Sequence, residues 1–111
     1  LPQLKQVVLG SHHPAFLPHT IKRLAFWVQI IGAKKGDVHS IIIYDQRGRI
    51  IAQSVKNVLS ASQPVGIFSI VHEIGSGKFA PGLYKGGFVA ERDVNGEKTV
   101  IEQHNNQIVL Q

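Results

Sequence analysis

The chain is built from short stretches in which hydrophobic and polar residues alternate, separated by segments rich in glycine, proline, aspartate and asparagine. Successive side chains of a β-strand point to opposite faces, so this period of two is typical of strands with one buried face. Phe26 and Val28, for example, fall on one face, with Trp27 on the other. No run of ten or more residues shows a helical face. We therefore predict an all-β chain with strands at residues 21–31, 38–44, 49–55, 65–73, 83–92, 97–103 and 107–110.

The best hairpin signal lies in the first half of the chain. Asp45-Gln46-Arg47-Gly48 has the composition of a tight turn, so residues 38–44 and 49–55 are expected to pair. The isoleucine-rich centre around Ile42 predicts a strand that is buried on both faces. Gly86-Gly87, inside a later strand, predicts a bulge or a close backbone contact.

The first twenty residues fit this pattern less well. We interpret residues 1–20 as a linker or an edge strand, with 4–9 as the candidate strand and 10–18 as an irregular loop. Residues 21–111 then form one domain, in keeping with a chain of 111 residues that is 43% hydrophobic.

One detail favours a particular type of sandwich. The segment Ala80-Pro81-Gly82-Leu83-Tyr84 places a tyrosine just after a Pro-Gly turn, at the start of a late strand. In immunoglobulin-like sandwiches such a tyrosine donates a hydrogen bond back across the corner. We therefore predict an immunoglobulin-like Greek-key β-sandwich of seven to eight strands, with Gly82 and Tyr84 in structural roles.

Composition narrows the classes of function. The chain has no cysteine, so disulfides, thiolate metal sites and cysteine nucleophiles are excluded. Twelve Lys and Arg against seven Asp and Glu give a formal charge of +5, but the basic residues are scattered. They form either an ordinary solvated surface or a surface that attracts an anionic polymer, such as nucleic acid or bacterial cell wall. No apolar run is long enough to predict a membrane span.

The apparent catalytic and metal motifs each lack a required member. Gly77-Lys78 is preceded by His72 and followed by Phe79 where a phosphate-binding loop needs glycine and Ser or Thr. There is no Gly-x-Ser-x-Gly elbow. The six histidines show no ligand spacing typical of a metal site, although the adjacent pair His12 and His13 remains a weak candidate for one in a loop. We expect neither a catalytic site nor a cofactor.

The candidate contact residues are aromatic or basic. Trp27 shares a face with polar residues and is either an exposed contact anchor or a core aromatic of the sandwich. Phe79 lies beside a lysine in a glycine-rich loop and is a second contact candidate. The binding residues that we predict are Trp27, Lys34, Lys35, Lys78 and Phe79.

Several of these segments also resemble a known family. Residues 24–28, Gly32, Gly36-Asp37, 45–52, 81–86 and Arg92-Asp93 are similar, in order, to the immunoglobulin-like domain that follows the catalytic domain in lysostaphin-type bacterial zinc cell-wall endopeptidases. The zinc motifs of that family, His-x₃-Asp and His-x-His, do not occur in this chain.

The resemblance implies a noncatalytic accessory module outside the bacterial cytoplasm, such as the periplasm, that supports a partner protein or a longer parent polypeptide. A binder of polyanions and a metal-handling protein using loop histidines are the two alternatives. The partner and the oligomeric state stay open.

Overall fold

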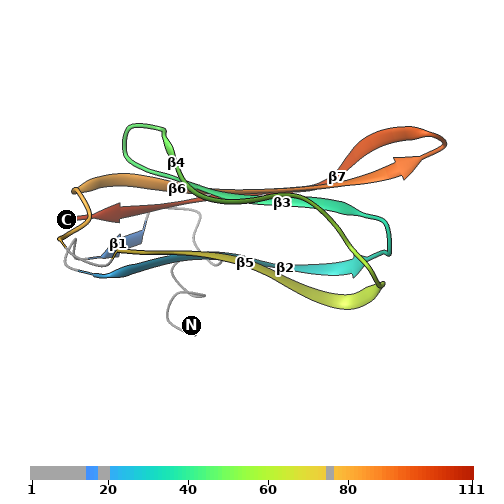
Figure 1. Ribbon diagram of the computed structural model, residues 1–111, viewed down its shortest axis with the longest axis horizontal. Helices are drawn as coiled ribbons and strands as arrows, with labels where there is room; N and C mark the ends of the chain where they lie inside the picture. Colours follow the sequence, from blue (N-terminus) through green and yellow to red (C-terminus); the bar gives the residue numbers. More distant parts are fainter. Residues whose placement is uncertain (1–14, 18–20, 75–76) are drawn as a thin grey trace.

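The protein is an all-β sandwich of two sheets that face each other (Figure 1). The computed structural model describes residues 15–17, 21–74 and 77–111. One sheet contains β2 (Arg23–Ala33) and β5 (Gln63–Glu73), paired antiparallel over almost their whole length. The other has the order β1-β7-β6-β3-β4. Its strands are β1 (Ala15–Leu17), β3 (Val38–Tyr44), β4 (Ile50–Val58), β6 (Gly82–Val94) and β7 (Glu97–Leu110).

The chain changes sheet four times, at the β1–β2, β2–β3, β4–β5 and β5–β6 connections. Two hairpins, β3–β4 and β6–β7, remain within the larger sheet. Asn95 and Gly96 turn the second hairpin with φ values of 54° and 84°, the left-handed backbone that an Asn-Gly turn provides. No helix long and apolar enough to cross a membrane occurs among the described residues.

The predicted all-β class is confirmed, and most strands lie within a few residues of their expected positions. The predicted break at residues 104–106 is wrong, because β7 continues through it. His104, Asn105 and Asn106 stay in register with Phe88, Gly87 and Gly86 of β6. Pairing with β6 therefore keeps these three polar residues in a strand, although their composition alone indicates a turn.

At the N-terminal end, the prediction of a loop over residues 10–18 is wrong for Ala15–Leu17. This segment forms β1, which runs parallel to the last three residues of β7. The candidate edge strand at residues 4–9 and the pair His12 and His13 lie outside the described residues.

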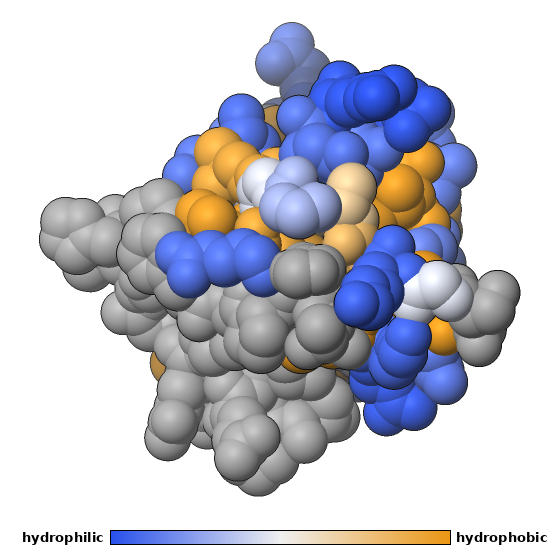
Figure 2. Space-filling model, turned by 90° about the vertical axis from the view of Figure 1, so that its left-hand side faces the viewer, coloured by the Kyte–Doolittle hydropathy of each residue, from blue (hydrophilic) through white to orange (hydrophobic). Residues whose placement is uncertain are grey.

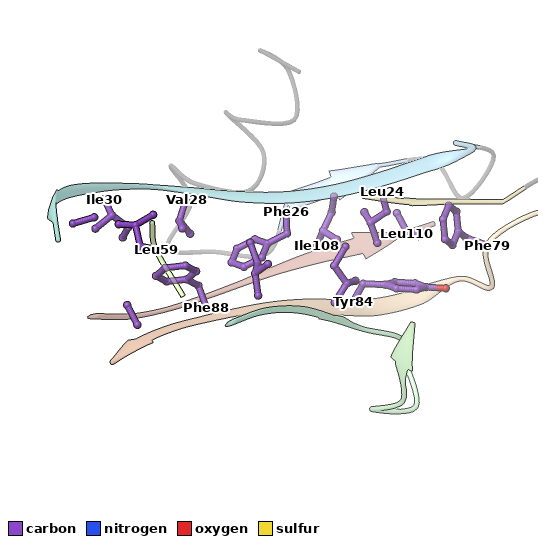
Figure 3. Packing of buried hydrophobic residues seen from close by; sticks show 14 residues of the cluster. Leu24, Phe26, Val28, Ile30, Leu59, Phe79, Tyr84, Phe88, Ile108 and Leu110 are labelled. Carbon is purple, nitrogen blue, oxygen red and sulfur yellow. The ribbon is translucent and has the colours of Figure 1, made fainter. Parts of the chain in front are cut away.

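The core lies between the sheets, where one face of β2 meets the inner face of the larger sheet (Figure 3). Leu24, Phe26, Val28 and Ile30 point toward the larger sheet, as their alternation predicts. They meet a second set of buried side chains from that sheet, which includes Ile41, Ile43, Tyr84, Phe88, Ala90, Ile108 and Leu110.

The prediction that Ile42 is buried on a strand covered on both faces needs correction. β3 is central in its sheet, between β4 and β6. Only its inner face is covered, however, so Ile41 and Ile43 are buried whereas Ile42 is half-buried on the outer face.

Three local predictions are confirmed. The backbone N–H of Arg47 and that of Arg49 both donate to Asp45 Oδ1 at 2.9 Å, closing the predicted turn between β3 and β4. The Tyr84 hydroxyl donates to the carbonyl oxygen of Ala80 at 2.7 Å. Gly82 has a φ of 141°, and a Cβ there would lie 2.7 Å from the Cβ of Gln46, so only glycine fits without strain.

Candidate interaction site

The structure separates the residues that the sequence proposed as contacts. Lys34 and Lys35 are exposed in the turn that joins β2 to β3. Lys78 and Phe79 lie at the opposite end of the sandwich, in the connection from β5 to β6. Trp27 is in the middle of β2. These five residues therefore do not form one surface.

Both aromatic candidates are buried. Phe79 is 6% exposed and its ring meets that of Tyr84 edge-on, with the centroids 5.8 Å apart. The expectation that Phe79 is an accessible loop aromatic is wrong, because the loop folds its ring into the core. Its sequence neighbour Lys78 remains exposed. Trp27 is 7% exposed, so it is not an exposed anchor, and it lies on the face of β2 opposite the core cluster.

One long side of the sandwich was not anticipated from the sequence. β7 has 14 residues and pairs with β6 from end to end. On its other edge, the described residues provide a partner only at Ile108, Val109 and Leu110, through β1. β2 likewise pairs only with β5 in the described part of the chain. We call this side, formed by residues 24–33 of β2 and 98–107 of β7, the open flank.

Polar side chains cover the inner face of β7 along the open flank. Glu102, His104 and Asn106 lie on the same inward-facing side of β7 as the buried Ile108. The residues between them face outward. Glu102 and His104 nevertheless reach solvent, since the two-stranded sheet does not extend over them; their side chains are 39% and 47% exposed. Glu102 Oε2 and His104 Nε2 lie 2.9 Å apart. No hydroxyl group hydrogen-bonds to His104 within the described ranges, so the pair lacks the nucleophile of a hydrolytic triad.

A partly open cavity of about 160 Å³ lies under one end of the open flank. Its walls come from both sheets, with Gly32 of β2 and Ile101 of β7 on the flank side. Most of the remaining lining is apolar and belongs to the core: Ile30, Ala33, Leu59, Phe68, Phe88 and Ala90. Figure 3 shows Ile30, Leu59 and Phe88 gathered at this end of the core.

An ion pair stands at the rim of the cavity. Arg92 of β6 donates from Nε to Asp37 Oδ1 and from a terminal nitrogen to Oδ2, both at 2.8 Å. Asp37 Oδ2 also accepts the backbone N–H of Lys34 at 2.9 Å, which is the turn-capping role expected of a short acidic residue. The hydrogen bonds from Arg92 are the main reason why the pKa of Asp37 lies below its ordinary value. The pair fixes the β2–β3 turn to β6 and holds this end of the flank in shape.

His39 is the neutral polar side chain that lines the cavity, beside the charged Asp37, Arg92 and Glu102. Its ring lies 4.3 Å from that of Phe68 and 6.5 Å from that of Phe88, measured between centroids. Its Nδ1 atom is buried, and no described residue hydrogen-bonds to it. Burial lowers the pKa of His39, so the ring is neutral near pH 7 and has one nitrogen that donates and one that accepts.

Sequence reasoning did not find His39, Arg92, Glu102 and His104, because their significance depends on which strands are adjacent. One usable signal was present: residues 102–107 are all polar, so the strand has no apolar position where an inward face of a sandwich is normally apolar. In the described residues, no three metal-ligating side chains gather in one place.

No family model matches the chain, and no curated protein or solved structure is significantly similar to it.

Proposed function

We propose that this chain is a noncatalytic interaction domain of immunoglobulin-like type, which binds an extended segment of a partner polypeptide along its open flank. The single observation that carries this proposal is the mismatch at β7: 13 of its 14 residues have a register partner in β6, whereas the described residues provide a partner on the other edge for only three. An exposed strand edge is a row of unpaired N–H and C=O groups to which another strand can add.

Two observations support the immunoglobulin-like, Greek-key part of the proposal. The order β7-β6-β3-β4 opposite β2–β5 matches strands G, F, C and C′ opposite B and E of a variable-type domain. Tyr84, at the start of the strand equivalent to F, donates to a carbonyl four residues upstream, as the tyrosine of such domains does. A partner strand on the open flank would then lie beside the strands equivalent to B and G.

The inner surface of the flank supports a role in binding rather than only in folding. Glu102 and His104 occupy inward positions and remain solvent-accessible, although inward positions of a closed sandwich are normally apolar and buried. A polar inner face discourages nonspecific pairing between edges. It also provides side chains that a matching segment can recognise. With the lysostaphin-type resemblance, we extend the proposal to an accessory module of an exported bacterial protein.

A peptide library tests this proposal even while the natural partner is unidentified. Random 12-residue peptides are selected on the intact domain, and the bound site is mapped by amide chemical shifts. The expected peptides perturb β7 between residues 98 and 107 and the facing edge of β2. Selected peptides that bind elsewhere on the domain, or a failure to select any peptide, would overturn the proposal.

Charge reversal provides the matched controls for that experiment. Glu102→Lys places the opposite charge on the inner face of the flank and should weaken the selected peptides at least tenfold. Glu97→Lys makes the same change at the exposed start of β7, beside the hairpin turn, and should leave binding within twofold. Equal effects of both substitutions would contradict recognition at the flank.

A second candidate function rests on the end of the sandwich that carries the β3–β4 turn and the β5–β6 connection. Figure 2 looks at this end and shows hydrophilic residues around a hydrophobic area. The exposed basic residues there include Lys22, Arg47, Arg49, Lys78 and Lys85. Arg49 is held by Asp45 at 3.1 Å, while Lys78 makes no ion pair within the described residues.

This surface favours a binder of polyanions. Binding of an anionic polymer is driven by release of its counterions, so the affinity should fall steeply with salt. DNA, RNA and cell-wall polymer, measured between low and moderate salt, provide the test. Lys78→Glu should weaken such binding and Lys34→Glu, at the opposite end, should not. An absence of binding at low salt would exclude this second candidate.

A further inference from the structure

The cavity beneath the open flank has the size of a single aromatic ring. Cavities of about 150 Å³ lined by Leu, Ile and Phe accommodate benzene, and the one here measures about 160 Å³. The rings of Phe68 and Phe88, 5.5 Å apart, form one wall. A guest ring in this space would meet aromatic faces and edges at the spacings that such pairs prefer.

The cavity differs from a purely apolar one because His39, Asp37, Arg92 and Glu102 also line it, and of these the ring of His39 is the neutral group. A buried polar nitrogen without a partner is rare in folded proteins, and its presence calls for a specific explanation. Here Nδ1 of His39 is that nitrogen among the described residues, and the ring lines the cavity. A guest with one hydrogen-bonding group can pair with this imidazole, whereas a purely hydrocarbon guest cannot.

The lining residues connect the cavity to the flank. Ile31 and Gly32 at the end of β2 and Ile101 and Glu102 of β7 line it on that side. In strand addition, the backbone hydrogen bonds supply affinity and pockets for alternate side chains supply specificity. A side chain of a segment lying between β2 and β7 therefore has direct access to this space.

We propose that the cavity is a specificity pocket for a phenol-sized aromatic side chain with a hydrogen-bonding group, that is, a tyrosine of the bound segment, whose hydroxyl pairs with His39. The link to a bound segment rests on the proposed function above. The pocket itself can be tested without any peptide.

Phenol and benzene are the probes, titrated into the intact domain labelled at its isoleucine and leucine methyl groups. We expect saturable shifts at Ile30, Leu59 and Ile101, with phenol binding at least tenfold more tightly than benzene. Methyl groups of Ile50 and Leu83, which do not line the cavity, serve as internal controls. An absence of saturable shifts would overturn the pocket, and equal affinity for the two probes would overturn the role of His39.

Two variants assign the effect to named side chains. His39→Phe keeps a ring against Phe68 and removes the ring nitrogens, so it should abolish the preference for phenol over benzene. Ala90→Leu fills the cavity and should abolish binding of both probes; its fold is verified by the unchanged dispersion of the amide spectrum. If Ala90→Leu misfolds, Ala33→Val, at a second lining position, provides the same test. Retained phenol preference in His39→Phe would contradict the proposal.

The outcomes separate this inference from the proposed function. Phenol binding without any peptide that binds the flank would leave the pocket in place and refute the interaction site. Peptides that bind the flank without a tyrosine, together with no phenol binding, would refute the pocket and leave the interaction site in place.

Discussion

Gly86 of β6 lies directly against the aromatic ring of Phe26 of β2, across the interface between the two sheets. A Cβ at residue 86 would be 2.5 Å from Cγ of Phe26, well inside van der Waals contact. This is the close backbone contact that the Gly86-Gly87 pair predicts. The two sheets can approach at this point only because residue 86 has no side chain.

The first prediction tests this contact. Gly86→Ala must push the Phe26 ring away from its buried position, and such overpacking costs about 1–3 kcal/mol. Gly87→Ala is the matched control, because the nearest atom to a Cβ there is 3.5 Å away. Urea denaturation of both variants measures the difference in their free energies of unfolding. Equal stability of the two would contradict the close approach of the sheets.

Tyr84 gives a second prediction, about the corner before β6. Tyr84→Phe removes the hydroxyl that donates to Ala80 and should lower the free energy of unfolding by about 1 kcal/mol. Tyr44→Phe is the control, since the Tyr44 hydroxyl has no hydrogen-bond partner in the described structure. Thermal denaturation of the pair distinguishes them. A Tyr84→Phe variant as stable as Tyr44→Phe would remove the support that this corner gives to the proposed immunoglobulin-like fold.

A third prediction concerns acid stability. The pKa of Asp37 is lowered in the folded protein, so its contribution to stability is complete above its unfolded pKa of about 3.9 and is lost as the pH falls through the lower, folded value. Asp37→Asn should cost about 2–3 kcal/mol at pH 7, which is less than the roughly 3–5 kcal/mol of a fully buried pair because Arg92 is 29% exposed. The difference in the free energy of unfolding between Asp37→Asn and the unsubstituted protein should shrink below about pH 4.

Glu73→Gln is the control for that measurement. Glu73 pairs with Arg23 at 3.0 Å, but both side chains are more than half exposed, so its loss should cost well under about 1 kcal/mol. Denaturant midpoints between pH 2 and 7 provide the comparison. A deficit in Asp37→Asn that stays constant down to pH 2 would show that the ion pair with Arg92 is not its origin.

The fourth prediction contrasts two neighbours on β3. Ile43→Asp buries an unpaired carboxylate in the core and should abolish folding. In Ile42→Asp the substituted side chain lies on the half-buried outer face. The substitution should lower the free energy of unfolding by only about 1–2 kcal/mol. Circular dichroism and denaturation of both proteins check this order. The reverse order would mean that β3 presents its other face to the core.

These residues also show which parts of the structure can be predicted from the sequence. The Asp45 turn and the Tyr84 corner have local signals, since each requires particular residues within about five positions. The alternation of Phe26 and Val28 likewise assigns their face correctly. Such features depend little on the rest of the chain.

Features that depend on distant neighbours were missed. The continuity of β7 through His104 is decided by β6, and the half-exposure of Ile42 is decided by the second sheet, which covers only the inner face of β3 among the described residues. Phe79 was expected in an accessible loop, but it is buried against Tyr84. The open flank itself is a relationship between β2 and β7, which are about 70 residues apart in the sequence. No local pattern contains that relationship.

The most direct test of the open flank is amide hydrogen exchange along β7, with and without a selected flank-binding peptide. In the free protein, amides of residues 98–107 that point toward β6 should be protected, and those that point away should exchange rapidly, so protection alternates along the strand. The peptide should protect the second set. Uniform protection along residues 98–107 in the free protein would show that this edge is already covered and would contradict the account.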